Sequence, residues 1–78
     1  MKAFNYSKDL FIICGFESKR DGFNHTGQVF YKGRMVFNDK IHYLNRTWES
    51  FEFETILRNC ESWIDNNLKL EKFIKIAK

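Results

Sequence analysis

The stretch Tyr43-Leu44-Asn45-Arg46-Thr47-Trp48-Glu49 is where the hydrophobic pattern of this chain changes. Before it, apolar residues recur with the two-residue period of a β-strand, and after it they recur with the 3.6-residue period of an α-helix. Because a strand runs into a helix here, the stretch predicts an α+β domain. No catalytic, metal-binding or phosphate-binding motif stands elsewhere in the sequence.

The residues that follow the junction predict one helix with a single apolar stripe. Thr47 is expected to cap this helix, and Glu49 lies where a negative charge favours the positive end of the helix dipole. Residues 65–67 are expected to end or kink it. The stripe recurs at helical spacing and consists of Phe53, Ile56, Leu57, Cys60, Trp63 and Ile64.

Three segments before the junction predict β-strands. Residues 10–16 are apolar on both faces, and residues 23–31 form a second strand in which Gly27 is expected to mark a bulge. Residues 34–43 predict a third, single bent strand. The interruption at residues 38–40 is read as a bulge in that strand, with a second turn as the alternative.

Two polar stretches predict the turns between these strands. Residues 18–22 end in Asp-Gly, which favours a hairpin loop of about five residues. Lys32-Gly33 favours a tight two-residue turn, because glycine accepts a positive φ angle.

Together these segments predict a single domain with the order β-β-β-α. A three-stranded antiparallel sheet is followed by one helix packed on one face, and the other face stays open. Residues 1–67 are expected to form the core and residues 68–78 a short basic amphipathic tail. We expect the tail to be helical, although strand alternation also fits part of it.

The composition favours a soluble domain. Nine Phe, three Tyr and two Trp supply large apolar side chains for the core of a 78-residue chain. The longest apolar run, residues 10–14, is far shorter than the ~20 residues that cross a bilayer, and no signal peptide is visible. We therefore expect a cytoplasmic protein without membrane contact, in which Cys14 and Cys60 are reduced core thiols.

The residue patterns argue against an enzyme. His25 and His42 fall in different strands, and no local pattern pairs either of them with a nucleophile. Cys14 lacks an adjacent positive charge that would activate it. The two Cys and two His also lack the close paired spacing of structural zinc sites, so neither a metal nor another cofactor is expected.

Nucleic-acid binding is a candidate function. Basic residues fall at both predicted hairpins and in the tail: Lys19, Arg20, Lys32, Arg34, Lys69, Lys72 and Lys75. The aromatic residues Phe23, Phe30, Tyr31 and Tyr43 could lie on the open sheet face for stacking, and the alternative is that they belong to the core. The layout is similar to plant ethylene-response domains and to the arm-binding domains of some phage integrases, which lay a sheet in the DNA major groove.

The charge distribution weakens that candidate. The net charge is +3, and residues 68–78 carry four Lys against one Glu. The remaining residues hold nine basic and nine acidic side chains, so the body of the domain is neutral. Nucleic-acid-binding domains usually carry their basic stripe on the folded body.

The segment Tyr-x-Asn-Arg-Thr-Trp-Glu at residues 43–49 resembles a group of short proteins from phages and prophages of Gram-positive bacteria. Asn45, Arg46 and Trp48 carry the resemblance, which weakens across residues 33–57. It implies no catalytic residue. It implies an accessory protein that binds a host or phage protein in the cytoplasm of an infected or lysogenic bacterium.

The leading hypothesis is therefore a protein-binding module of phage or mobile-element origin. Such a module could inhibit host defence, as anti-CRISPR proteins do, by binding a nucleoprotein defence complex. The expected partner-binding residues are Tyr43, Asn45, Arg46 and Trp48. DNA or RNA binding is the alternative, and self-association through aromatic residues is a third hypothesis.

The same segment also has a purely structural explanation. Asn45 and Thr47 can bond the free N–H groups of the first helical turn. Trp48 can pack over the end of the sheet, and Arg46 can bridge to Glu49 or to a carbonyl.

Overall fold

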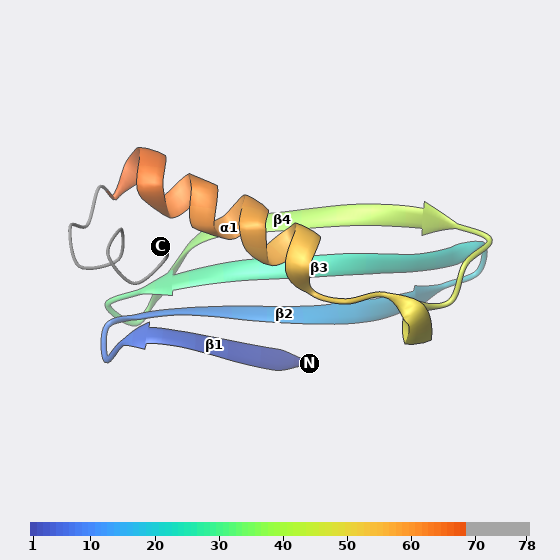
Figure 1. The fold of residues 1–78 in the computed structure, drawn as a ribbon, viewed down its shortest axis with the longest axis horizontal. Helices are drawn as coiled ribbons and strands as arrows, with labels where there is room; N and C mark the ends of the chain where they lie inside the picture. Colours follow the sequence, from blue (N-terminus) through green and yellow to red (C-terminus); the bar gives the residue numbers. More distant parts are fainter. Residues whose placement is uncertain (69–78) are drawn as a thin grey trace.

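The computed structural model describes residues 1–68, which form one sheet and one long helix. The strands β1 (Lys2–Ser7), β2 (Leu10–Lys19), β3 (Gly22–Tyr31) and β4 (Arg34–Leu44) are followed by the 3₁₀-helix Trp48–Ser50 and helix α1 (Glu54–Asn67). The strands lie in the order β1-β2-β3-β4, and every neighbouring pair is antiparallel (Figure 1).

The predicted class and the final helix are confirmed, but the described sheet has four strands rather than three. The missed strand is β1, which pairs with the first half of β2. Within it, only Phe4 and Tyr6 face the core, and a register shift between Asn5 and Ser7 interrupts the pairing. Two inward side chains in a short, irregular strand give too weak an alternation to be recognised in the sequence.

The sequence predicts two of the three turns between the strands, and these two differ in outcome. Lys32 and Gly33 form the predicted two-residue turn, with φ angles of 52° and 79°. The other loop is shorter than expected, because β2 continues to Lys19 and β3 begins at Gly22. The polar residues 17–19 therefore belong to a strand, and they lie in its exposed end.

The predicted bulges were misplaced. Gly27 pairs regularly with Cys14 on one side and Asp39 on the other, so no bulge lies there. β4 is one continuous strand, as expected, but its irregularity lies at Val36, between the pairs Val29–Phe37 and Phe30–Met35, rather than at residues 38–40.

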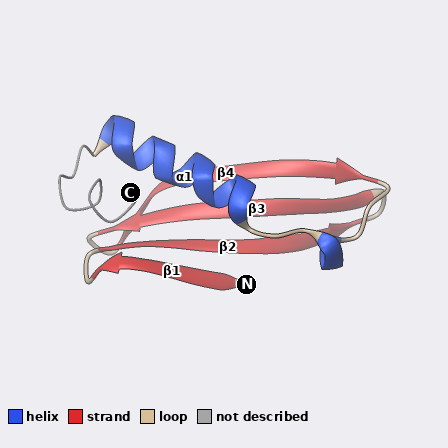
Figure 2. Ribbon diagram, in the orientation of Figure 1, coloured by secondary structure: helices blue, strands red, loops and turns tan. Residues whose placement is uncertain are grey.

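Helix α1 packs diagonally on one face of the sheet, against β2, β3 and β4 (Figure 2). Ile56, Cys60 and Ile64 of the helix are fully buried there. Each fully buried aliphatic side chain of this size contributes about 1.5–3 kcal/mol. The sheet side of the core consists of Leu10, Ile12, Cys14 and Val29.

Two interactions determine how this helix sits. A Cβ atom at Gly27 would lie 2.7 Å from Ile56 Cγ1 and 2.9 Å from Cys60 Sγ, so the helix rests directly on the backbone of β3. The Tyr6 hydroxyl also donates a hydrogen bond of 2.5 Å to Glu61, which joins β1 to the helix.

Both cysteines are buried and unpaired, as expected. Burial raises the pKa of Cys14 to about 11 and that of Cys60 to about 12. Both groups are therefore protonated thiols at neutral pH.

The helix starts later than predicted. Thr47 precedes only the short 3₁₀-helix and makes no side-chain capping bond to it, while α1 begins at Glu54. The Thr47 hydroxyl instead bonds the Glu49 carboxylate and is the main cause of its lowered pKa. The chain is extended at Phe51, between the two helices.

The predicted end of the helix at residues 65–67 is confirmed, because α1 ends at Asn67. The tail prediction lies almost wholly outside the described residues. Neither helix of residues 1–68 is long and apolar enough to cross a membrane.

We expect Gly27→Ala to destabilise the fold by about 1–3 kcal/mol, the usual cost of overpacking a tight core. The added methyl group would push Ile56 and Cys60 away from the sheet. Urea unfolding followed by circular dichroism measures the loss.

Gly15→Ala is the matched control. Its Cβ would meet nothing closer than 3.4 Å, at Thr26 Oγ1 on the open face, so its stability should stay near that of the parent. Equal stability of the two variants would contradict the close approach at Gly27.

Candidate functional site

Helix α1 covers only the end of the sheet near the β1–β2 and β3–β4 turns (Figure 1). At the other end, the connecting segment 45–53 crosses the same face. Rings from this segment pack against rings from the sheet, and we call this group the distal aromatic cluster. It consists of Phe16, Phe23, His25, Tyr43, Phe51 and Phe53.

Contacts between aromatic rings hold the connecting segment on the sheet. Tyr43 of β4 stacks on Phe23 of β3 with 5.0 Å between ring centroids, and Phe51 of the segment lies 4.7 Å from Tyr43. On the β2 side, Phe53 lies 4.9 Å from Phe16. Phe23, in the middle, is only 1% exposed. Aromatic pairs at such distances contribute about 0.5–1.5 kcal/mol beyond the burial of their area.

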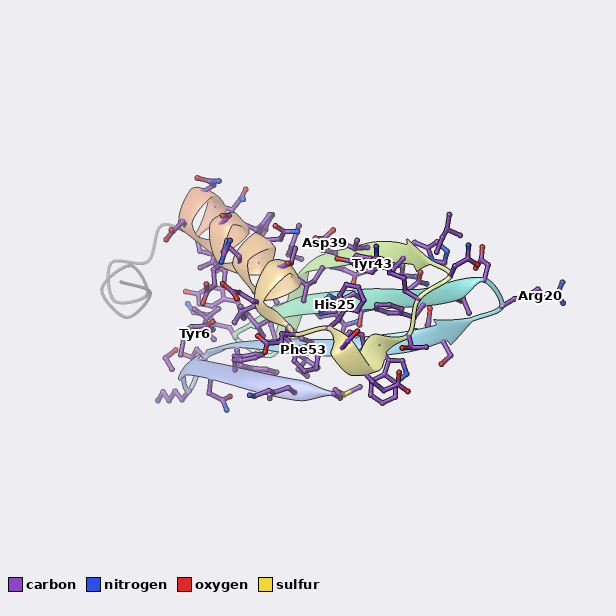
Figure 3. The ribbon with its side chains drawn as sticks, turned by 45° about the vertical axis from the view of Figure 1, so that its right-hand side comes forward. Tyr6, Arg20, His25, Asp39, Tyr43 and Phe53 are labelled. Carbon is purple, nitrogen blue, oxygen red and sulfur yellow. The ribbon has the colours of Figure 1, made fainter. Side chains whose placement is uncertain are left out.

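His25 behaves as one more aromatic ring in this cluster (Figure 3). It is 1% exposed and stacks on Phe16 at 4.7 Å, and its edge meets Phe53 at 5.7 Å. Neither ring nitrogen has a hydrogen-bond partner among the described residues. Burial lowers the pKa of His25, because the charged imidazolium would lose its hydration there.

Three of the four predicted partner-binding residues help to hold the connecting segment. Tyr43 packs into the cluster, as described above. Asn45 has a left-handed φ of 54°, and its backbone N–H donates a 2.6 Å bond to the carbonyl of Asp21. The Arg46 guanidinium lies 5.7 Å above the Phe51 ring, a cation–π contact rather than the predicted bridge to Glu49 or a carbonyl.

The fourth residue, Trp48, combines a large apolar ring with exposure to solvent. Its ring stacks on Phe16 at 5.7 Å with an interplanar angle of 22°, yet the residue remains 45% exposed. Met1, Phe16, Ser18 and Trp48 line a shallow hollow of about 250 Å³. We call these four residues the Trp48 surface.

The Trp48 surface adjoins an unpaired strand edge. β1 pairs with β2 only between the Lys2–Cys14 and Ser7–Leu10 pairs, so residues 15–19 of β2 have β3 as their one neighbour within the described sheet (Figure 1). We call residues 15–19 the free edge of β2. Sequence reasoning missed this feature because it missed β1, whose length determines where the edge becomes free.

The predicted nucleic-acid-binding residues are not brought together. Lys19 and Arg20 lie at one end of the sheet, and Lys32 and Arg34 lie at the other. Strands of ten residues separate the two ends by roughly 30 Å at 3.3 Å per residue. Arg20 points away from the molecule (Figure 3). Lys69, Lys72 and Lys75 lie outside the described residues.

Carboxylates also offset the basic charge at the β2–β3 end. Glu17 lies 3.1 Å from Lys19 and accepts a 3.0 Å bond from the Asn24 amide. The Asn24 oxygen in turn lies 2.7 Å from His42 Nδ1, and His42 Nε2 lies 3.2 Å from Asp21. This network lies on the open face and includes two carboxylates, so negative charges partly balance the basic side chains at this end of the sheet.

Three of the four aromatic residues considered for stacking lie on the helix side of the sheet, as the core alternative has it. Phe23 and Tyr43 belong to the distal aromatic cluster, and Tyr31 packs against the core. Of the predicted four, Phe30 lies on the open face, where it stacks on Phe11 at 5.0 Å. Alternation along β3 separates Phe30 from Phe23 and Tyr31, because neighbouring residues of a strand face opposite sides.

Within residues 1–68, no group of three or more His, Cys, Asp or Glu side chains is arranged to hold a metal ion. Comparison of the chain with known protein families, curated proteins and solved structures gave no match. Function is therefore inferred from the geometry of the sites described above.

We expect His25 to make the fold sensitive to acid. The unfolded chain binds a proton at this residue below the ordinary histidine pKa of about 6.5, whereas the folded state resists it. Stability from the neutral ring is fully present above that pKa and is lost as pH falls towards the lowered pKa of the folded state. The loss can reach about 1.4 kcal/mol per pH unit in this window.

His25→Phe removes this titration and keeps the stacking on Phe16. Urea unfolding of both proteins between pH 7.5 and 5 should show a steeper loss of stability for the parent. Parallel curves would contradict the buried, neutral state of His25.

Proposed function

We propose that this protein is a non-enzymatic module that binds another protein through the Trp48 surface. The observation that carries the proposal is a large aromatic side chain that is both exposed and held in place. Trp48 is nearly half exposed, while Phe16 beneath it is fixed by the distal aromatic cluster. A rigid aromatic ring loses little entropy on binding, which is why Trp is enriched among binding hot spots.

The surroundings of Trp48 also suit a protein partner. Arg46 is exposed nearby, and Arg is another residue type enriched at binding hot spots. The hollow beside Trp48, about 250 Å³ in volume, can receive one or two side chains but is smaller than typical small-molecule sites of about 300–1,000 Å³.

The candidate nucleophiles and bases favour binding over catalysis. Cys14 and Cys60 are buried with raised pKa values, so neither supplies a thiolate at neutral pH. His25 is buried among aromatic rings, and His42 contacts Asn24 and Asp21 on the open face. Among the described residues, these contacts do not include a nucleophile next to a base.

The resemblance at residues 43–49 extends the proposal to the kind of partner. We propose a bacterial or phage protein, including the protein part of a nucleoprotein defence complex. Nucleic-acid binding has less support, because the two basic turns are far apart and Glu17 offsets Lys19.

The test is affinity capture of the tagged full chain from a lysate of a low-GC Gram-positive bacterium, with and without nuclease. We expect a stoichiometric protein that remains after nuclease treatment. Trp48→Ala should weaken its capture at least about tenfold, because losing a central hot spot costs about 2 kcal/mol or more.

Met35→Ala is the matched control, because Met35 is also large, apolar and 52% exposed but lies at the opposite end of the sheet. It should capture as much protein as the parent. Urea unfolding of both variants checks that they fold. Recovery of nucleic acid alone, or equal capture by all three proteins, would refute the proposal.

A further inference from the structure

We infer that the partner binds as an extended strand that adds, antiparallel, to the free edge of β2. This inference rests on the proposed function and specifies its mode of binding. Along a strand, the N–H and C=O groups of one residue point toward one neighbouring strand, and those of the next residue point the opposite way. Along residues 16–19 the side away from β3 has no neighbouring strand within the described sheet, so backbone groups there are open to a new one.

The register of β1 determines where the added strand would lie. β1 pairs Phe4 with Ile12 and Lys2 with Cys14, so the same line continues with Met1 opposite Gly15. Consistent with this, the Met1 side chain would lie 3.9 Å from a Cβ at Gly15. A strand that continues this line beyond Met1 can place residues opposite Phe16, Glu17, Ser18 and Lys19.

The two faces of the sheet determine which side chains this strand carries. Residues directly opposite each other in an antiparallel pair point to the same face. Partners of Phe16 and Ser18 would therefore point to the helix side, into the hollow that these residues form with Trp48. That hollow favours apolar side chains of moderate size at both positions.

The strand residues opposite Glu17 and Lys19 would face the open side of the sheet. Glu17 and Lys19 lie there, 3.1 Å apart and about half exposed. A basic side chain opposite Glu17 and an acidic one opposite Lys19 would each gain an opposite charge. From its N-terminus, the added strand thus carries four residues in the order acidic, apolar, basic and apolar. They lie opposite Lys19, Ser18, Glu17 and Phe16.

The other outer edges are less suited to strand addition. The edge of β4 is broken by the irregularity at Val36, and Asn59 of the helix reaches across to Asp39 with a bond of 3.1 Å. The pairing of β1 is interrupted between Asn5 and Ser7. Irregular edges of this kind resist pairing with another chain.

The probe is the peptide Ac-Thr-Glu-Val-Lys-Val-NH2, titrated to millimolar concentration into the ¹⁵N-labelled full chain. We expect chemical-shift changes at residues 15–19 and at the Trp48 indole. Two N-methylated isomers of this peptide test the backbone hydrogen bonds. One carries its methyl groups on the backbone nitrogens of both Val residues, and the other carries them on those of Glu and Lys. Because N–H groups alternate in direction, one isomer should bind like the parent peptide and the other should bind at least about tenfold more weakly.

Ser18→Arg tests the hollow from the protein side. Ser18 is exposed and its side chain lines the hollow, so the larger residue should leave the fold intact and abolish peptide shifts. Thr26→Arg, on the open face, is the control and should bind the peptide normally.

Each contrary outcome has a distinct meaning. Equal binding of the two methylated isomers, or no shifts at residues 15–19, would overturn strand addition. The proposed function would still stand if Trp48→Ala lost the captured protein. Concentration-dependent dimers with changed shifts at residues 15–19 in the absence of peptide would overturn the inference in favour of a second copy at this edge.

Discussion

The contact of helix α1 with the bare backbone of β3 at Gly27 is the constraint on which the rest of this structure depends. Because no side chain separates them, Ile56 and Cys60 approach β3 closely and bury the centre of the core. The helix then lies over one end of the sheet only (Figure 1). The other end of the same face must be covered by something else, and in a chain this short the connecting segment does it.

That covering segment explains the high aromatic content. The segment holds only the short 3₁₀-helix Trp48–Ser50 and is extended at Phe51, and large flat rings fill the space between it and the sheet. Phe51 packs against Tyr43 and Phe23, and Phe53 packs against Phe16 and His25. Phe16 of this cluster stacks on Trp48, which is how one exposed aromatic side chain becomes a fixed part of the surface. Structural packing and the candidate binding surface are therefore one arrangement.

The sequence by itself determined the order of most elements. The change of period at residues 43–49, the Lys32-Gly33 turn and the stripe ending at Ile64 each rest on local patterns of side chains, and local patterns are visible in a sequence. Composition likewise showed a neutral body, and the four residues named for partner binding include Trp48. Whether that residue binds a partner stays a prediction.

Only the tertiary structure decided on which face or edge of the sheet each residue lies. β1 is identified by its pairing with β2, because its own alternation is weak. This pairing stops at the Lys2–Cys14 pair, and the free edge beside Trp48 lies beyond it. The inward orientation of Phe23, Tyr31 and Tyr43 depends on strand register, and the role of Gly27 depends on a helix about thirty residues later in the chain. These features are contacts between distant segments. A local pattern cannot specify them, because the same apolar residue fits a core, a face or an edge until its neighbours are in place.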